Sequence, residues 1–229
     1  MQKLDPLKDN LSSVELVRIS GSDLDIVSAA RVCFGKTAES FGEREEKLIA
    51  YLLKNKHTSP FEHNQLVYKV KLPLFVARQW MRHRIGVSYN EISGRYSELP
   101  LDFYIPNKWR IPDAKNKQSS CFVNLKNEAE LLEKYKKSID IAGKTYKELI
   151  EAGVTRELAR CVLPLCTYTE FIFTCNLVSL MHFLNLRADS HAQWEIQQYA
   201  NCLQELAQPH FPSSFKAWIE LKKQNKENL

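Results

Sequence analysis

Glycine is scarce in this chain of 229 residues, which contains 7 of them. No G-x-G-x-x-G stretch occurs, so any dinucleotide is not held by the glycine-rich turn of a Rossmann fold. The six cysteines form no C-x-x-C pair and lie at no zinc-like spacing with histidine. This pattern speaks against the common zinc motifs and indicates reduced, buried cysteines in a cytoplasmic protein.

Long apolar segments are also missing. The first residues, MQKLDPLKDN, lack the apolar core of a secretory signal. The most apolar window, FIFTCNLVSLMHFLNL (171–186), contains two asparagines and a histidine and is too short and polar to span a membrane. We therefore expect a cytoplasmic protein with no membrane partner. A net charge of +5 is compatible with small anions or nucleic acid and does not choose between them.

The pattern of apolar residues predicts an α+β fold in a single domain over residues 1–229, with no repeat or linker. Strands are predicted at 14–20, 64–72 and 167–175. Helices are predicted at 22–34, 43–55, 73–84 and 155–165, and one long helix or a helix pair at 123–152. Two more helices should follow residue 175, the second opened by a capping box at 190–193, and 107–121 should be loop. We expect a small, mostly antiparallel sheet covered by helices.

Charge is densest in RHRIGVSYNEISGRY (82–96), which begins in the last residues of the amphipathic segment 73–84. Leu74, Ala77 and Met81 of that segment should pack on the sheet. Guanidinium groups are donor forks that match phosphate oxygens, and the interleaved glycines and serines bring N–H groups and hydroxyls close to an anion. Glu91 could order an arginine or accept a hydrogen bond from a ligand. The segment predicts an anion site, with a solvated basic loop or an RNA-contacting patch as the alternative.

A second cluster, HTSPFEH (57–63), surrounds a Pro-Phe turn. In the simpler interpretation, these histidines are hydrogen-bonded structural residues. Metal ligation by His57, Glu62 and His63 is the alternative, but the helical i, i+4 histidine pair of metalloprotease motifs is missing. We therefore predict no metal site.

A third cluster, NLRADSHAQWEIQQYA (185–200), begins at the margin of an apolar helical stripe. Arg187 lies at that margin and needs a partner, which Asp189 or the end of its own helix would provide in a purely structural role. Arg160 lies in another apolar segment, where Glu157 is its structural partner three residues earlier.

Together the three clusters resemble the flavin-dependent thymidylate synthases. R-H-R followed by a spaced serine and G-R-Y, the SPFEH segment and LNLRADSHAQWEIQQYA are typical of that family, in the same order over residues 14–205. Some features depart from it. Eight residues rather than seven separate R-H-R from Ser93, and Val178 and His182 stand where relatives often carry Arg and Asn.

The resemblance implies reductive methylation of dUMP to dTMP by a homotetramer of the family's own fold. Methylenetetrahydrofolate would supply the one-carbon unit, and FAD, reduced by NADPH, would supply the hydride. Active sites would combine residues from several subunits. All these ligands are anions, which agrees with the concentration of arginine and histidine in residues 82–96.

Matching positions imply the site residues. The dUMP contacts would be Gln79, Arg82, Glu91, Ser93, Gly94, Arg95, Arg160 and Arg187. The FAD contacts would be Ser59, Glu62, Arg82, His83, Arg84, Ile85, Glu91, Asn176, His182 and His191. Three residues would be catalytic. Arg187 would activate the uracil ring, Ser93 would orient dUMP, and His57 would lie near the flavin and the folate.

Two other functions fit the same residues. An RNA-binding module would use the basic patch with Tyr89 and Tyr96 as stacking platforms. A metal-free phosphodiesterase would use His57 and His83. A flavin absorption spectrum of the purified protein separates the synthase from both.

We predict that no cysteine acts as a nucleophile. A reactive cysteine needs an electropositive, accessible setting, whereas these lie mostly in apolar strings, and only Cys161 and Cys175 adjoin predicted site residues. Replacing each cysteine by Ala or Ser should keep the rate of dTMP formation within about tenfold, or about 1.4 kcal/mol. Steady-state dTMP formation by each variant checks this. Complete loss in one folded, FAD-loaded variant would contradict it.

Overall fold

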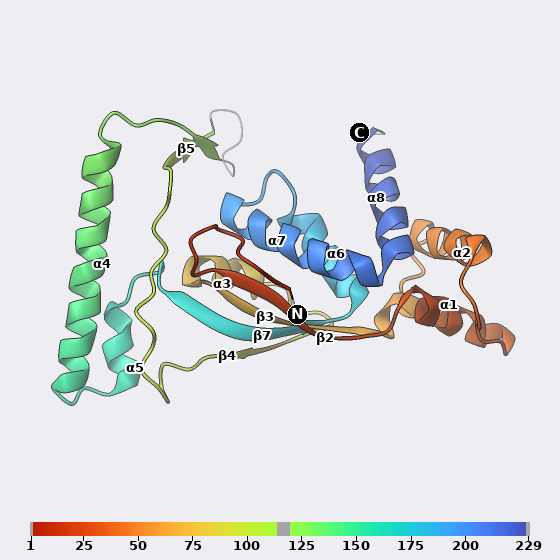
Figure 1. Ribbon diagram of the computed structural model, residues 1–229, viewed down its shortest axis with the longest axis horizontal. Helices are drawn as coiled ribbons and strands as arrows, with labels where there is room; N and C mark the ends of the chain where they lie inside the picture. The colour runs from red at the N-terminus through yellow and green to blue at the C-terminus, as the bar shows by residue number, and fades with distance from the viewer. Residues whose placement is uncertain (1, 114–119, 228–229) are drawn as a thin grey trace.

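The computed structural model describes residues 2–113 and 120–227, and its centre is a five-stranded antiparallel sheet in the order β1-β2-β3-β7-β4 (Figure 1). Its strands are β1 (Lys3–Leu4), β2 (Ser13–Ser20), β3 (Gln65–Pro73), β4 (Val87–Glu91) and β7 (Tyr168–Cys175). A separate pair joins β5 (Arg110–Pro112) and β6 (Ser120–Phe122). The predicted α+β class with a small antiparallel sheet is confirmed.

Helices cover one face of the sheet and stand at both of its ends. They are α1 (Asp23–Arg31), α2 (Glu43–Lys54), α3 (Leu74–Trp80), α4 (Glu128–Glu151), α5 (Arg156–Ala159), α6 (Leu177–Arg187), α7 (Trp194–Ala207) and α8 (Pro212–Glu227). Figure 1 shows α3, α6 and α7 on one face, α4 and α5 at one end, and α1, α2 and α8 at the other. None of these described helices has both the length and the apolar character needed to cross a membrane.

Trp80 connects the sheet to the helices that cover it. The indole is fully buried, with ring centroids 5.5 and 5.4 Å from Phe171 and Phe173 of β7. It lies 4.7 Å from Phe183 of α6 and 6.0 Å from Tyr199 of α7. Burying one large apolar side chain contributes about 1.5–3 kcal/mol, and each aromatic pair adds to that. The last residue of α3 is thereby held in the core.

The predicted helix 73–84 is wrong at its C-terminus, because α3 ends at Trp80. The Tyr89 hydroxyl donates to the carbonyl oxygens of Trp80, at 3.3 Å, and His83, at 2.9 Å, and so satisfies acceptors that a longer helix would have used. The buried face of α3 is consequently Val76, Ala77 and Trp80 rather than the predicted Leu74, Ala77 and Met81.

Other boundaries also differ. The strand β4, which was not predicted, pairs with β7 from Val87↔Cys175 to Glu91↔Phe171. The predicted loop 107–121 contains β5 and the start of β6, while its residues 114–119 lie outside the described residues. The helix predicted from residue 123 begins at Glu128.

The C-terminal helices were also placed imperfectly. No capping box opens α7, because its N-cap is Gln193 and makes no side-chain cap bond. Instead, the carboxylate and carbonyl of Asp189 accept from the N–H groups of His191 and Ala192, which closes a turn before the helix. A third helix, α8, begins at Pro212, and proline suits a first helical position.

Asp23 joins the two ends of the chain, and we predict that Asp23→Ala lowers the free energy of unfolding by about 2 kcal/mol. The buried carboxylate accepts from the N–H groups of Ser213, at 2.7 Å, and Ser214, at 3.2 Å, at the start of α8. Its loss leaves these donors without their acceptor. Urea unfolding measures the effect. Asp25→Ala, on the exposed side of the same helical turn, is the control and should change little.

Candidate active site

The cationic segment, residues 82–85, turns from α3 into β4 beside the start of α6. Gly86 makes this turn with φ +65°, which glycine adopts without strain. A Cβ at Gly86 would lie 2.3 Å from the hydroxyl oxygen of Ser179. That hydroxyl donates to the carbonyl of Ile85 at 3.0 Å, and the Ser179 N–H donates to the capping side chain of Asn176 at 2.9 Å. The cationic segment is therefore hydrogen-bonded to the first turn of α6 through Ser179.

Arg187, the last residue of α6, is bound to the cationic segment and to α3. Its Nε donates to Nε2 of His83 at 3.0 Å, and its Nη2 donates to the backbone carbonyl of Gln79 at 3.1 Å. A ring nitrogen that accepts carries no proton, so the neutral His83 imidazole holds its proton on Nδ1. Burial, together with the charges of Arg187 and His182, lowers the pKa of His83 to about 4. Burial also lowers the pKa of Arg187.

Two bonds thus fix the orientation of the Arg187 guanidinium. The structural partners considered for it were Asp189 and the end of its own helix, and the structure adds His83 and Gln79, which come from outside that helix. Asp189 itself accepts from Nδ1 of His191 at 2.7 Å.

A cavity of about 280 Å³ opens between the cationic segment and α6. It brings together six of the predicted site residues, namely Arg82, His83, Arg84, Ile85, His182 and Arg187. The rings of Phe173 and Phe183 also line it. Cationic donors beside apolar rings suit a planar aromatic ligand that carries phosphate.

A second cavity, of about 400 Å³, contains Glu91, Gly94 and Arg160. Glu91 accepts from the Thr169 hydroxyl at 2.5 Å. A Cβ on Gly94 would lie 2.9 Å from Leu99 and 3.1 Å from Cδ of Arg160, so glycine leaves room for both side chains. Glu157, the structural partner considered for Arg160, instead pairs with Arg95 at 3.3 Å.

The two cavities lie at opposite ends of β4. Val87 lines the first cavity and Glu91 the second. A strand rises about 3.3 Å per residue, which places these two residues roughly 13 Å apart. A single chain therefore brings the predicted dUMP residues together in two groups rather than one.

The remaining predicted residues line neither cavity. Ser59 and Glu62 are exposed on the short 3-10 turn η2 (Ser59–Glu62), which contacts α6, and His57 is exposed just before it. Ser93 lies in a turn, where its hydroxyl accepts from the N–H of Arg95 at 3.3 Å. Among the described residues, no group of three His, Cys, Asp or Glu side chains could hold a metal ion.

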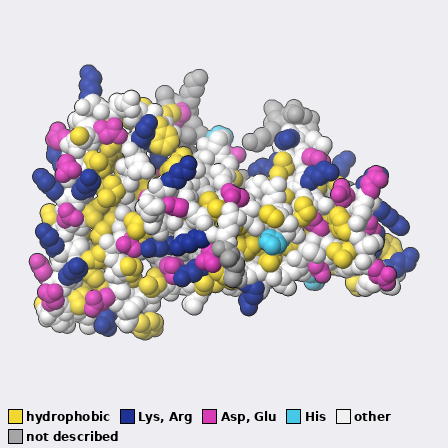
Figure 2. Space-filling model, in the orientation of Figure 1, with side chains coloured by type: hydrophobic (Ala, Val, Ile, Leu, Met, Phe, Trp, Pro, Cys, Tyr) yellow, Lys and Arg dark blue, Asp and Glu magenta, His cyan; other side chains and the backbone are white. Residues whose placement is uncertain are grey.

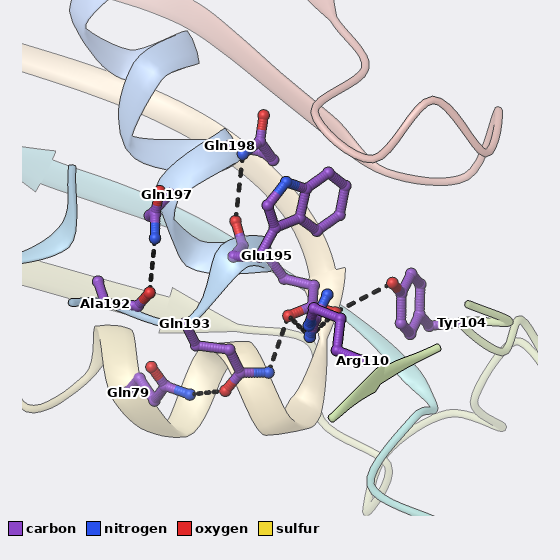
Figure 3. A network of polar contacts seen from close by, with 9 residues as sticks. Gln79, Tyr104, Arg110, Ala192, Gln193, Glu195, Gln197 and Gln198 are labelled. Carbon is purple, nitrogen blue, oxygen red and sulfur yellow. Dashed lines mark hydrogen bonds and ion pairs between the residues drawn. The ribbon is translucent and has the colours of Figure 1, made fainter. Parts of the chain in front are cut away.

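A polar network behind Gln79 was not predicted from the sequence (Figure 3). Glu195 is 2% exposed and accepts from Nη2 of Arg110 at 2.8 Å on each carboxylate oxygen. Gln193 links this pair to Gln79. One signal was available: Glu195 lies four residues before the core residue Tyr199, so it places a charge on the buried face of α7.

Residues 15–213 match the family described as thymidylate synthase complementing protein. The chain belongs to this family. It is 48% identical over 208 residues to the flavin-dependent thymidylate synthase of Thermosipho melanesiensis, covering 90% of each chain. It is 47% identical over 207 residues to that of Thermotoga neapolitana, again with 90% coverage of each.

The fold of this chain is also that of a solved methylase. The UMP/dUMP methylase PolB from Streptomyces cacaoi, bound with 5-Br dUMP, superposes with a TM-score of 0.83 and 34% identity. The match covers 91% of this chain and 95% of the methylase. The resemblance to the flavin-dependent thymidylate synthases is confirmed.

The six cysteines of this family member are all free thiols, and their settings differ. Burial raises the pKa of Cys166 and Cys175, and raises that of Cys202 to about 11. Cys161 is exposed and lines the second cavity beside Arg160. It is therefore the cysteine whose replacement tests most directly for a thiol nucleophile.

We predict that His83 makes the stability depend on pH. Its pKa is about 4 in the fold and near 6.5 when unfolded, so the unfolded chain binds more protons between these values. The contribution of neutral His83 is complete above about pH 6.5 and is lost as the pH falls toward 4. His83→Gln should flatten this dependence in urea unfolding at pH 7, 6 and 5. The exposed His210→Gln is the control, and an equal slope in the His83 variant would contradict the assignment.

Proposed function

We propose that this protein methylates dUMP to dTMP reductively, with methylenetetrahydrofolate as one-carbon donor and NADPH-reduced FAD as hydride source. The observation that carries the proposal is the cavity in which Arg187, fixed by His83 and Gln79, faces the cationic segment. The relatives named flavin-dependent thymidylate synthase and the methylase bound with 5-Br dUMP support it.

The chemistry of the first cavity fits a flavin. Its arginines and histidines can bind phosphate, and its phenylalanine rings can pack on a planar ring system. When bound, the flavin supplies the hydride chemistry, and the protein supplies orientation and charge. The residues proposed to hold it are Ser59, Glu62, Arg82, His83, Arg84, Ile85, Glu91, Asn176, His182 and His191.

The nucleotide is proposed to bind through both groups of residues. Its contacts are Gln79, Arg82 and Arg187 from the first group and Glu91, Ser93, Gly94, Arg95 and Arg160 from the second. Ser93 orients dUMP through its hydroxyl, and His57 lies near flavin and folate. Because no enzyme nucleophile is proposed, the pyrimidine must become electron-rich at C5 while negative charge grows on the adjacent carbonyl oxygen.

Arg187 is suited to stabilise that charge. A partly buried guanidinium is screened less than an exposed one, so its attraction for the developing charge is stronger. Its bonds to His83 and Gln79 hold it in one orientation before the reaction. An interaction that strengthens as the charge grows lowers the barrier rather than merely binding substrate.

Complete sites are proposed to form in a homotetramer. The separation of the two cavities along β4 supports this, because one copy presents each group of residues at a different place. Ile85 and Tyr96, beside the two groups, are 90% and 79% exposed, and contact with another copy of the chain would remove this apolar surface from water. Hydrophobic side chains also reach the surface beside α4 in Figure 2.

Residues 1–229 are proposed to act as one domain, because buried side chains from the sheet and from α1, α2, α3, α4, α6, α7 and α8 form one cluster. A cytoplasmic location is proposed from the six free thiols.

The two alternative functions fit the geometry less well. Tyr89 is half-buried and holds the end of α3 through its hydroxyl, so it cannot serve as an RNA-stacking platform. His83 is a weak candidate for the base of a phosphodiesterase, because Nε2 already accepts from Arg187 and the pKa is about 4.

We predict that Arg187→Lys binds FAD and is reduced by NADPH, yet forms dTMP about a hundredfold more slowly, about 2.7 kcal/mol. Lysine keeps the charge but loses the fork that reaches His83 and Gln79 together. The measurements are dTMP formation from dUMP, methylenetetrahydrofolate and NADPH, and flavin reduction followed by absorbance.

The exposed Arg78→Lys on α3 is the matched control and should form dTMP at the normal rate. Equal losses of flavin reduction and methylation would make Arg187 a flavin-binding or structural residue. A wild-type protein that retains no flavin and forms no dTMP would refute the proposed function.

A further inference from the structure

A chain of side-chain hydrogen bonds connects a buried carboxylate to Gln79 (Figure 3). It begins at Glu195, which pairs with Arg110 and also accepts from the Tyr104 hydroxyl at 3.0 Å. Nε2 of Gln193 donates to the same carboxylate at 2.9 Å. Oε1 of Gln193 then accepts from Nε2 of Gln79.

This chain sets the direction of both amides. A carboxylate paired with arginine only accepts hydrogen bonds, so Gln193 must turn its NH₂ group toward Glu195. Its oxygen is left for Gln79, which must therefore donate. Turning either amide over would place donor against donor or acceptor against acceptor. The polarity of Gln79 is thus decided by Glu195, two hydrogen bonds away.

The consequence is that Gln79 offers its oxygen to a ligand. Oε1 points away from the network in Figure 3 and accepts from no other group among the described residues. The backbone carbonyl of the same residue holds Arg187, the group proposed to act on the pyrimidine. Gln79 therefore belongs to the hydrogen-bond chain through its amide and supports Arg187 through its backbone carbonyl.

We propose that Gln193 and Glu195 are positioning residues that make Gln79 an obligate hydrogen-bond acceptor, and that this selects uracil over cytosine. The inference rests on the proposed function. Uracil carries an N–H donor at N3, whereas the N3 of cytosine is an acceptor that would face another acceptor. dUMP and dCMP share sugar and phosphate, so the phosphate-binding arginines cannot distinguish them. A site built to pair one hydrogen-bonding group discriminates strongly against a ligand that lacks it.

The network could instead serve only to stabilise the fold. In that case, breaking it would weaken the binding of both nucleotides alike. A positioning role predicts a change in the ratio of the two affinities, because a Gln79 amide released from Gln193 can turn and donate to cytosine N3.

The test measures the dissociation constants of dUMP and dCMP for the FAD-loaded protein by calorimetry. The wild type should prefer dUMP. In Gln193→Leu the preference should fall by about tenfold or more, with a smaller change in dUMP affinity alone. Gln193→Met, which is closer in shape to glutamine, is measured in parallel as a second variant that lacks the amide. The matched control is Gln197→Leu on the same helix, whose amide donates to the carbonyl of Ala192 at 2.6 Å outside this chain.

An unchanged ratio in either folded, FAD-loaded Gln193 variant would overturn the inference, as would an equal fall in the Gln197 control. A wild type that binds dUMP and dCMP equally would overturn it as well, while leaving thymidylate synthesis intact. A wild type that binds neither nucleotide would refute the proposed function itself.

Discussion

The burial of Trp80 is the constraint on which the candidate site depends. Its indole packs against Phe171 and Phe173 of the sheet and against Phe183 of α6. Met81 follows it and packs against the core, and the next five residues, 82–86, form the cationic segment and Gly86. The aromatic contacts therefore determine where the helix ends and where the arginines begin.

The packing around Trp80 also brings distant parts of the chain to the site. Phe183 belongs to the same helix as Arg187, so one packing interaction sets the distance between this guanidinium and His83. The Tyr89 hydroxyl donates to the backbone carbonyls of Trp80 and His83, and Tyr89 belongs to β4, which ends at Glu91. The two cavities are thus positioned from one aromatic cluster.

Gln79 connects the Arg187 guanidinium to the ion pair of Glu195 and Arg110. Arg187 uses its backbone carbonyl, and the Glu195–Arg110 pair acts on its side chain through Gln193. A buried ion pair contributes little net stability, because desolvation offsets much of its attraction. Its more general effect is to leave a polar group with only one satisfactory orientation. This orientation is what the proposed selection of the base would use.

Alternating and helical apolar patterns in the sequence determined most of the central strands and helices, and spaced arginines, serines and glycines marked the anion-binding segment. Strand β4 was not predicted because its alternation is short, with only Val87 and Tyr89 set against Ser88 and Asn90, and because its partner, β7, lies about eighty residues later. The end of α3 and the unprotonated Nε2 of His83 depend on Tyr89 and Arg187, which arrive from other elements. The sequence supplied these residues, but only the tertiary structure decided which of them touch, because hydrogen-bond polarity and burial depend on neighbours far away along the chain.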